Sequence, residues 1–238
     1  MRASRVGILV WSAVLAVTAL RAIFDAKLPM TGDEAYYWEW SRRLAAGYVD
    51  HPPAVAFAIA AFAWLGRTPF AVRLPFVLCG LGTAIFAAGA ANVLSGDRRA
   101  GWIAALAVSL APMMIVAFGM VSPDGPFALF WALSLYCAAR AFRGRSWQWF
   151  ALLGIALGLA LLSRFFAIAL LGGIAGAACA KPYRSMLPRV AFSALVACAV
   201  WSPFLFWNAS HHWISFTFSL VQRHEPQYSF GRPFLIYL

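Results

Sequence analysis

Residues 54–66 read Ala-Val-Ala-Phe-Ala-Ile-Ala-Ala-Phe-Ala-Trp-Leu-Gly, and the topology of the whole chain depends on whether this apolar run crosses a membrane. Its 13 residues are fewer than the roughly 20 that a spanning helix needs. A short apolar run of this kind is typical of a helix that lies in the membrane interface or re-enters from one side. We therefore predict that it does not cross.

The composition is that of an integral membrane protein. Of the 238 residues, 63% are hydrophobic and 11% are charged, and the mean hydropathy is +0.76, which excludes an ordinary soluble domain. The net charge of +11 would also suit a nucleic-acid-binding protein. However, the Lys and Arg residues lie in short loops between apolar runs, as the positive-inside rule describes. The predicted fold class is an all-α, polytopic membrane helical bundle.

Other apolar runs are long enough to span, and they give about seven predicted spans. The first follows Arg2 and Arg5 and begins like a signal peptide, but it continues to Phe24 without a small-residue cleavage site. We therefore expect an uncleaved first span. The predicted spans cover residues 6–24, 70–94, 100–120, 125–141, 147–163, 165–180 and 187–207.

Charge then orients the bundle. If residues 54–66 do not cross and the N-terminus is cytoplasmic, the basic clusters at 97–99, 140–145 and 181–184 all face the cytoplasm. If the run crosses, all three lie outside. We therefore predict a multi-pass protein of the cell inner (plasma) membrane with residues 25–69 as its first periplasmic loop, which carries juxtamembrane helices. The segments 122–126, 163–164 and 211–232 fall on the same outer face.

This outer loop concentrates the acidic residues. Four of the eight in the chain, Asp33, Glu34, Glu39 and Asp50, lie in or just after the stretch Gly-Asp-Glu-Ala-Tyr-Tyr-Trp-Glu-Trp-Ser at 32–41. Because adjacent helical residues point in different directions, Asp33 and Glu34 would not form a dyad. One could face a substrate while the other binds a cation, an Arg or a backbone amide. Alternatively, Asp33 simply caps a helix over 34–44.

The neighbouring residues also allow two interpretations each. Tyr36 and Tyr37, with the nearby tryptophans, could line a groove for a sugar or a lipid headgroup, or form an interfacial aromatic belt. The segment Asp50-His51-Pro52-Pro53 could place His51 and the first amides of a helix against a phosphate. It could equally be a helix-start signal with an Asp–His hydrogen bond.

Further ionisable residues lie on the predicted outer face. Asp124 occupies a Pro-Asp-Gly-Pro turn, where Asp is a common turn former. Arg164 interrupts a long apolar stretch, and it could either snorkel at a span end or bind a lipid-linked phosphate. The adjacent His211 and His212 could hold a divalent cation only with a third ligand such as Asp50, so a metal is one alternative and no cofactor is the other.

The order of motifs resembles a known family. Gly-Asp-Glu-Ala-Tyr-Tyr-Trp is followed by Gly-Tyr-Val-Asp-His-Pro-Pro at 47–53, Phe-Ala-Val-Arg-Leu-Pro at 70–75 and Ser-Pro-Asp at 122–124. The chain thus resembles the polyprenyl-phosphate-sugar-dependent membrane glycosyltransferases of the GT-C fold, which include protein O-mannosyltransferases and the aminoarabinose transferases acting on lipid A. The resemblance covers residues 1–238 as a single domain. Residues 231–238 look like the start of another span, so we expect the N-terminal part of a longer protein.

The resemblance implies a reaction and a set of roles. A sugar would pass with inversion from a polyprenyl-phosphate donor to a hydroxyl of a lipid, glycan or protein acceptor in the cell envelope, such as lipopolysaccharide. A polyprenyl phosphate leaves as a stable anion, so one base and nearby cations suffice, unlike in a glycosidase. The catalytic residues would be Asp33, as general base, and Glu34. The donor phosphate would bind His51, Arg164 and Arg223, and the substrates would contact Tyr36, Tyr37, Asp50 and Asp124.

His51 and Arg164 stand where the lipid A enzymes have lysines, which leaves the identity of the sugar open. Two other classes of protein fit the composition: a membrane transporter and a non-catalytic, truncated member of the family. A transporter would carry its acidic residues near the middle of its spans. Here they lie at the ends of apolar runs, which favours the transferase.

Overall fold

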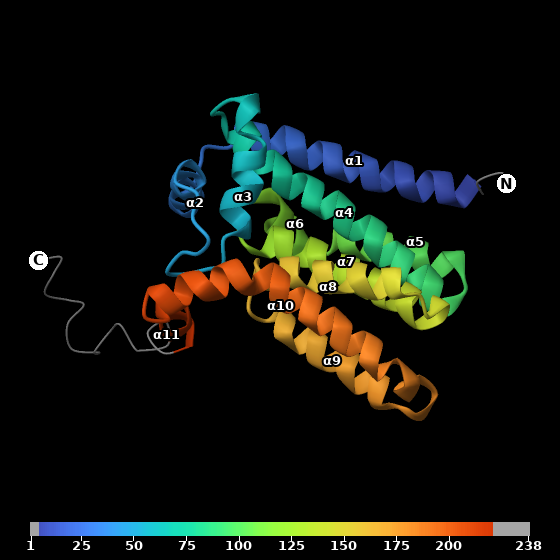
Figure 1. The fold of residues 1–238 in the computed structure, drawn as a ribbon. Coiled ribbons are helices and arrows are strands. Elements are labelled where there is room, and N and C mark those ends of the chain that lie inside the picture. Colours follow the sequence, from blue (N-terminus) through green and yellow to red (C-terminus); the bar gives the residue numbers. More distant parts are fainter. Residues whose placement is uncertain (1–4, 221–238) are drawn as a thin grey trace, which may run out of the picture.

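The structure is a computed structural model that describes residues 5–220, and in this range it contains helices and no strands (Figure 1). The long bundle is made by α1 (Arg5–Lys27), α4 (Pro69–Ser95), α5 (Arg98–Leu110), α6 (Pro112–Gly119), α7 (Asp124–Gly144), α8 (Trp147–Leu161), α9 (Ala167–Cys179) and α10 (Leu187–Ser210). The short elements are α2 (Gly32–Arg42), α3 (Ala54–Ala61), α11 (Ile214–Leu220) and the 3-10 helices η1 (Ala63–Leu65) and η2 (Lys181–Met186). The predicted all-α membrane bundle is confirmed.

The predicted spans all form helices, but not all have the full length of a span. By length and composition, α1, α4, α7 and the continuous segment Lys181–Ser210 could each cross a membrane. The pair α5 and α6 would make a fifth span despite a bend of 64° between them. The apolar helices α8 and α9 are shorter, with 15 and 13 residues.

The apolar run at 54–66 agrees with the prediction that it does not cross. It forms α3, which has 8 residues and is therefore about 12 Å long, followed by the single turn of η1. The hydrocarbon core of a bilayer is about 30 Å thick. In Figure 1, α2 and α3 lie together with α11 at the left end of the bundle.

The predicted span at 100–120 is broken in its second half. Helix α5 ends before Ala111, whose extended backbone (ψ 128°) precedes Pro112, the first residue of α6. Proline has no backbone N–H and disfavours the helical region for the residue before it, so the helix stops and restarts in a new direction. The sequence contains this signal, and the predicted span at 100–120 is a bent helix pair that is long and apolar enough to cross as one broken span.

Helices α8 and α10 pack very closely through two glycines. A Cβ atom added to Gly154 would lie 2.5 Å from the carbonyl oxygen of Ser193, and one added to Gly158 would lie 2.5 Å from the Cβ of Val200. Gly154 and Gly158 are four residues apart and therefore form the small-xxx-small surface that lets membrane helices approach each other.

We expect Gly158→Leu to separate α8 from α10 and to lower the free energy of unfolding by about 1–3 kcal/mol, the usual range for overpacking. The measurement is the thermal unfolding midpoint of the purified protein in detergent. Gly172→Leu is the matched control, because a Cβ at Gly172 in α9 would meet nothing within 4 Å. Equal destabilisation by both variants would contradict this account.

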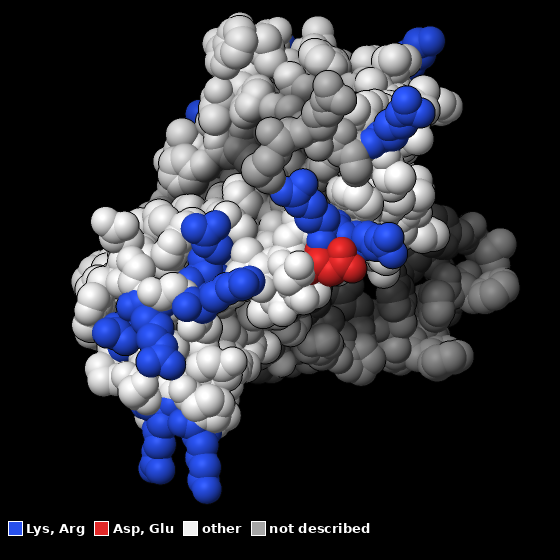
Figure 2. All heavy atoms as spheres, turned by 90° about the vertical axis from the view of Figure 1, so that its right-hand side faces the viewer, with Lys and Arg blue, Asp and Glu red and all other residues white. Residues whose placement is uncertain are grey.

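The two ends of the bundle differ in their charged residues: one is almost purely basic, and the other contains both acidic and basic side chains. Figure 2 looks onto the end where α5 starts and α7 ends, and shows many Lys and Arg side chains around one small acidic area. The loops and helix termini at this end contain Asp97, Arg98, Arg99, Arg143, Arg145, Lys181 and Arg184. We call it the basic end. The other acidic residues of the described chain lie at the opposite end: Asp25, Asp33, Glu34, Glu39, Asp50 and Asp124.

Candidate functional site

Helix α2 carries the acidic pair and begins with a capping box. The backbone N–H of Thr31 donates to Glu34 Oε2 at 2.8 Å, and the N–H of Glu34 donates to Thr31 Oγ1 at 3.4 Å. Each side chain thus satisfies a backbone group at the helix start. The helix begins two residues earlier than the predicted residue 34, and the Thr-x-x-Glu spacing is the signal that would have located its N-cap at Thr31.

Glu34 is fully buried and paired with Arg73 of α4. Arg73 Nε donates to Glu34 Oε1 at 2.6 Å and Nη2 donates to Oε2 at 2.5 Å. The N–H of Val121 donates to Oε1 at 3.2 Å. Glu34 is 0% exposed and Arg73 is 3% exposed. Burial alone would raise the pKa of Glu34, but the hydrogen bonds from Arg73 and from the two backbone N–H groups lower it, so the pair is ionic.

Arg73 also holds the chain that leaves α1. Its Nη1 donates to the carbonyl oxygens of Asp25 at 2.6 Å and Leu28 at 2.9 Å, and its Nη2 donates to that of Pro29 at 2.8 Å. We call Arg73, Glu34 and the backbone groups bonded to them the Arg73 cluster. It joins the end of α1, the start of α2, α4 and the segment before α7. Sequence reasoning noted Arg73 only as part of a motif, although an Arg within an apolar helix is itself a signal.

Asp33 is the exposed member of the acidic pair. It lies in the first turn of α2, and within residues 5–220 its carboxylate forms no hydrogen bond or ion pair. Its backbone is fixed on both sides, because Thr31 and Glu34 belong to the capping box and Glu34 belongs to the Arg73 cluster. An accessible carboxylate on a rigid backbone is therefore available to a ligand.

Aromatic side chains of α2 contact the segment that follows this helix, at Tyr48 and Asp50. The hydroxyl of Tyr36 donates to Asp50 Oδ2 at 3.2 Å. Burial, the charge of Asp50 and this hydrogen bond raise the pKa of Tyr36. The ring of Trp40 stacks on Tyr48 at 4.0 Å. These contacts make the loop a folded surface next to Asp33.

His51 is buried, whereas the predicted phosphate-binding role would require an accessible side chain. Its side chain is 8% exposed, and its ring centroid is 6.2 Å from that of Tyr37. Pro52 and Pro53 follow it and are also buried, and α3 begins at Ala54. His51 therefore packs against the inner side of the aromatic surface.

The structure brings Asp124 and Arg164 together although 40 residues separate them. Arg164 Nη2 donates to Asp124 Oδ2 at 2.8 Å, and Nε lies 2.7 Å from Oδ1. Asp124 is in the first turn of α7, and its side chain is 47% exposed. Arg164 lies in the break between α8 and α9, and its side chain is 21% exposed. Arg164 is therefore an ion-paired cation rather than an isolated snorkelling one.

Helix α3 connects the loop that carries Asp50 and His51 with the α8–α9 break that carries Arg164. The backbone N–H of Ala54 donates to the carbonyl oxygen of Leu162 at 3.0 Å, which fixes the start of α3 against the break that holds Arg164. An apolar cavity of about 310 Å³ lies directly beside this contact. Its lining comes from α3, α4, α7, α8 and the adjoining residues: Pro53, Ala54, Phe57, Ala58, Cys79, Pro126, Phe130, Leu159 and Leu162. Asp124 and Arg164 each lie two residues along the chain from a lining residue, Pro126 and Leu162. A charged pair close to an apolar cavity suits a ligand with a charged head and a hydrocarbon tail.

The histidines after α10 do not form a metal site with the outer loop. His211 stacks on Trp207 with ring centroids 4.1 Å apart, and its Nδ1 is 2.7 Å from the Trp207 carbonyl oxygen. Within residues 5–220, no three or more His, Cys, Asp or Glu side chains are grouped so that they could hold a metal ion. The suggested set of Asp50, His211 and His212 is therefore not assembled. Arg223 lies outside the described residues.

Several apolar helices of span length, with charged and aromatic side chains gathered at one end, define the class of the multi-pass membrane proteins. Residues 50–207, more than half of the chain, match the family described as dolichyl-phosphate-mannose-protein mannosyltransferase, and the chain belongs to this GT-C glycosyltransferase family. The predicted resemblance is thereby confirmed.

A curated relative is also named as a glycosyltransferase. The chain is similar to "Lipid A galacturonosyltransferase RgtD" of Rhizobium johnstonii, with 30% identity over 182 residues. The match covers 75% of this chain and 38% of RgtD, so the chain spans well under half the length of that relative. No solved structure matches the chain.

Proposed function

We propose that the chain carries the transfer site of a membrane glycosyltransferase that uses a polyprenyl-phosphate-linked sugar and glycosylates a hydroxyl of an acceptor. The observation that carries the proposal is the exposed Asp33 carboxylate, held on a backbone that the buried Glu34–Arg73 pair fixes. A general base must be accessible to the acceptor proton and well positioned, and Asp33 meets both requirements. Family membership supplies the reaction class.

In this mechanism Asp33 accepts the proton of the acceptor hydroxyl while that oxygen attacks the anomeric carbon. The bond from this carbon to the phosphate oxygen breaks on the opposite face, so the configuration inverts. The polyprenyl phosphate leaves with the electron pair of that bond. Glu34 does not contact a substrate in this scheme, because both of its oxygens are occupied by Arg73 and backbone N–H groups. It is a positioning residue for Asp33.

We assign the leaving phosphate to the Asp124–Arg164 pair. Arg164 is partly exposed, and a planar guanidinium can share its donors between a carboxylate and a phosphate. The adjacent apolar cavity would take the first part of the isoprenoid chain. Tyr36 and Asp50 would contact the sugar or the acceptor from the α2 side, and His51 would support that surface from below.

The acceptor and the orientation are also proposals. The name of RgtD favours a glycolipid acceptor over a protein. The positive-inside rule favours a cytoplasmic basic end, and the opposite end with Asp33 would then face the periplasm of the inner membrane. The direct test incubates membranes containing the full-length protein with radiolabelled polyprenyl-phosphate sugars. Label should pass to the lipid fraction, and no transfer from any such donor would contradict the proposal.

We expect Arg164→Gln to raise the donor KM by about tenfold or more, because a charge-assisted hydrogen bond to the phosphate is lost. The acceptor KM should change little. Donor and acceptor titrations in the same assay measure both values. Arg67→Gln is the matched control, since Arg67 is an exposed arginine just before α4 with no assigned part in the reaction. An unchanged donor KM in the Arg164 variant would exclude Arg164 as the phosphate ligand.

A further inference from the structure

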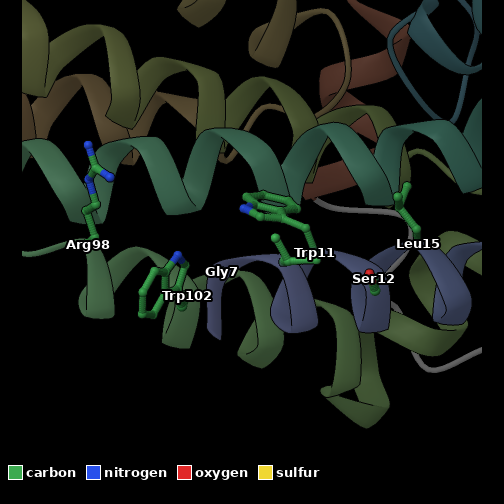
Figure 3. Close-up of a pocket in the computed structure, with 7 residues that line it drawn as sticks. Gly7, Trp11, Ser12, Leu15, Arg98 and Trp102 are labelled. Carbon is green, nitrogen blue, oxygen red and sulfur yellow. The ribbon is translucent and has the colours of Figure 1, made fainter. Parts of the chain in front are cut away.

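A second cavity lies at the other end of the bundle, about 390 Å³ in volume and between the first halves of α1 and α5 (Figure 3). Helix α1 contributes Gly7, Ile8, Trp11, Ser12 and Leu15, and α5 contributes Arg98 and Trp102. Most of α1 faces outward, since 17% of its most apolar window is buried inside the bundle. The cavity is therefore open towards the surrounding bilayer and is remote from Asp33, which follows the opposite end of α1.

The polarity of this cavity changes along its length. Arg98 lies at the start of α5, and Figure 3 shows it at one end of the row of residues, with Leu15 at the other. From Gly7 to Leu15 the helix rises by roughly 12 Å, which is two turns into the apolar part of α1. Trp11 and Trp102 lie between these ends. Tryptophan with an arginine beyond it is the usual arrangement at a lipid headgroup boundary.

Arg98 is available for an external anion. It is exposed, and it has no ion-pair partner in the part of the chain that the structure describes. The neighbouring carboxylate of Asp97 accepts a hydrogen bond from the backbone N–H of Arg99 at 2.9 Å and so caps α5. Further Lys and Arg residues cover the same end and raise the local concentration of anionic lipid.

From this geometry we propose that the cavity binds one anionic phospholipid of the leaflet at the basic end. Its phosphate binds the Arg98 guanidinium, and one acyl chain lies between α1 and α5 against Ile8, Trp11 and Leu15. A free phosphate would leave the apolar part unused, and the quaternary ammonium of a zwitterionic lipid would lie unfavourably among the Lys and Arg residues of the basic end. The lipid fills the space between α1 and α5 and therefore stabilises the position of α1. This site is independent of sugar transfer.

The test is native mass spectrometry of the purified full-length protein, titrated in detergent with phosphatidylglycerol or phosphatidylcholine. We expect one phosphatidylglycerol to bind more tightly than phosphatidylcholine, and Arg98→Gln to weaken that binding about tenfold. Ser12→Trp keeps the charge but fills the acyl part of the cavity, and should also weaken binding. Arg184→Gln removes the same charge from η2 at the same end and should leave binding intact.

Three outcomes would overturn the proposal. If the Arg98 and Arg184 variants lost phosphatidylglycerol binding equally, the lipid would be attracted to the basic end in general and not to this cavity. Unchanged binding in the Ser12 variant would mean that no acyl chain enters the cavity. Glycerol phosphate that competes as well as the intact lipid would indicate a phosphate site without a lipid.

Discussion

Replacing Asp33 by Asn is expected to lower sugar transfer by about 10²- to 10⁴-fold, the usual contribution of a general base. The variant keeps the size of the side chain but cannot accept the acceptor proton. Because Asp33 is exposed and outside the Arg73 cluster, the protein should fold and insert as before. The measurement is the single-turnover rate of label transfer from a polyprenyl-phosphate sugar at saturating donor, together with the thermal unfolding midpoint.

Glu39→Gln is the matched control for this experiment. Glu39 is another carboxylate of α2, but it forms ion pairs at 3.4 Å with Arg42 and Arg43 on the helix surface. Such exposed pairs contribute little to stability, and Glu39 has no assigned part in the reaction. Its variant should keep nearly full activity. Normal turnover by the Asp33 variant, or equal losses in both, would exclude Asp33 as the base.

Replacing Arg73 by Ala is expected to lower the free energy of unfolding by about 3–5 kcal/mol, the range for breaking one partner of a buried ion pair. The change leaves the Glu34 carboxylate buried without its cation and removes the donors to three carbonyl groups. Activity should fall as well, because the backbone that carries Asp33 is no longer fixed. Chemical or thermal unfolding of the purified protein in detergent gives the stability.

A double variant makes this prediction sharper. Arg73→Met combined with Glu34→Met removes both buried charges, so it should be more stable than the Arg73→Ala variant, even though the hydrogen bonds are lost. Arg42→Ala is the control, because its ion pair is exposed and should cost less than about 1 kcal/mol. If Arg73→Ala were as stable as Arg42→Ala, the Arg73 cluster would not be the anchor of the loop between α1 and α4.

The sequence predicted the features that depend on local composition. Apolar run lengths located the helices, and the distribution of Arg and Lys separated the two ends, because both properties can be read directly from the local sequence. The bend before Pro112 was missed, although the proline is visible in the sequence. The composition of residues 100–120 is apolar throughout, but Pro112 has no backbone N–H and cannot continue the preceding helix.

The pairing of charges could not be predicted in the same way. Glu34 and Arg73 are 39 residues apart, and Asp124 and Arg164 are 40 apart, so no local spacing relates them. Which carboxylate is buried and which is exposed depends on how α4 and the segment before α7 pack against α2. Sequence reasoning expected Asp33 and Glu34 to point in different directions, but it could not say which one is buried; the structure buries Glu34 and exposes Asp33.

The hydrogen bond between Ala54 and Leu162 has a consequence for biosynthesis. The loop that carries Asp33 is translated early, but its contacts reach forward to Val121 and Leu162. During synthesis this loop must therefore wait at the membrane surface until more than a hundred further residues have been inserted. We expect ribosome-bound chains that stop before α8 to leave the start of α3 at Ala54 open to protease attack, and this segment to become protected only once the α8–α9 break has emerged.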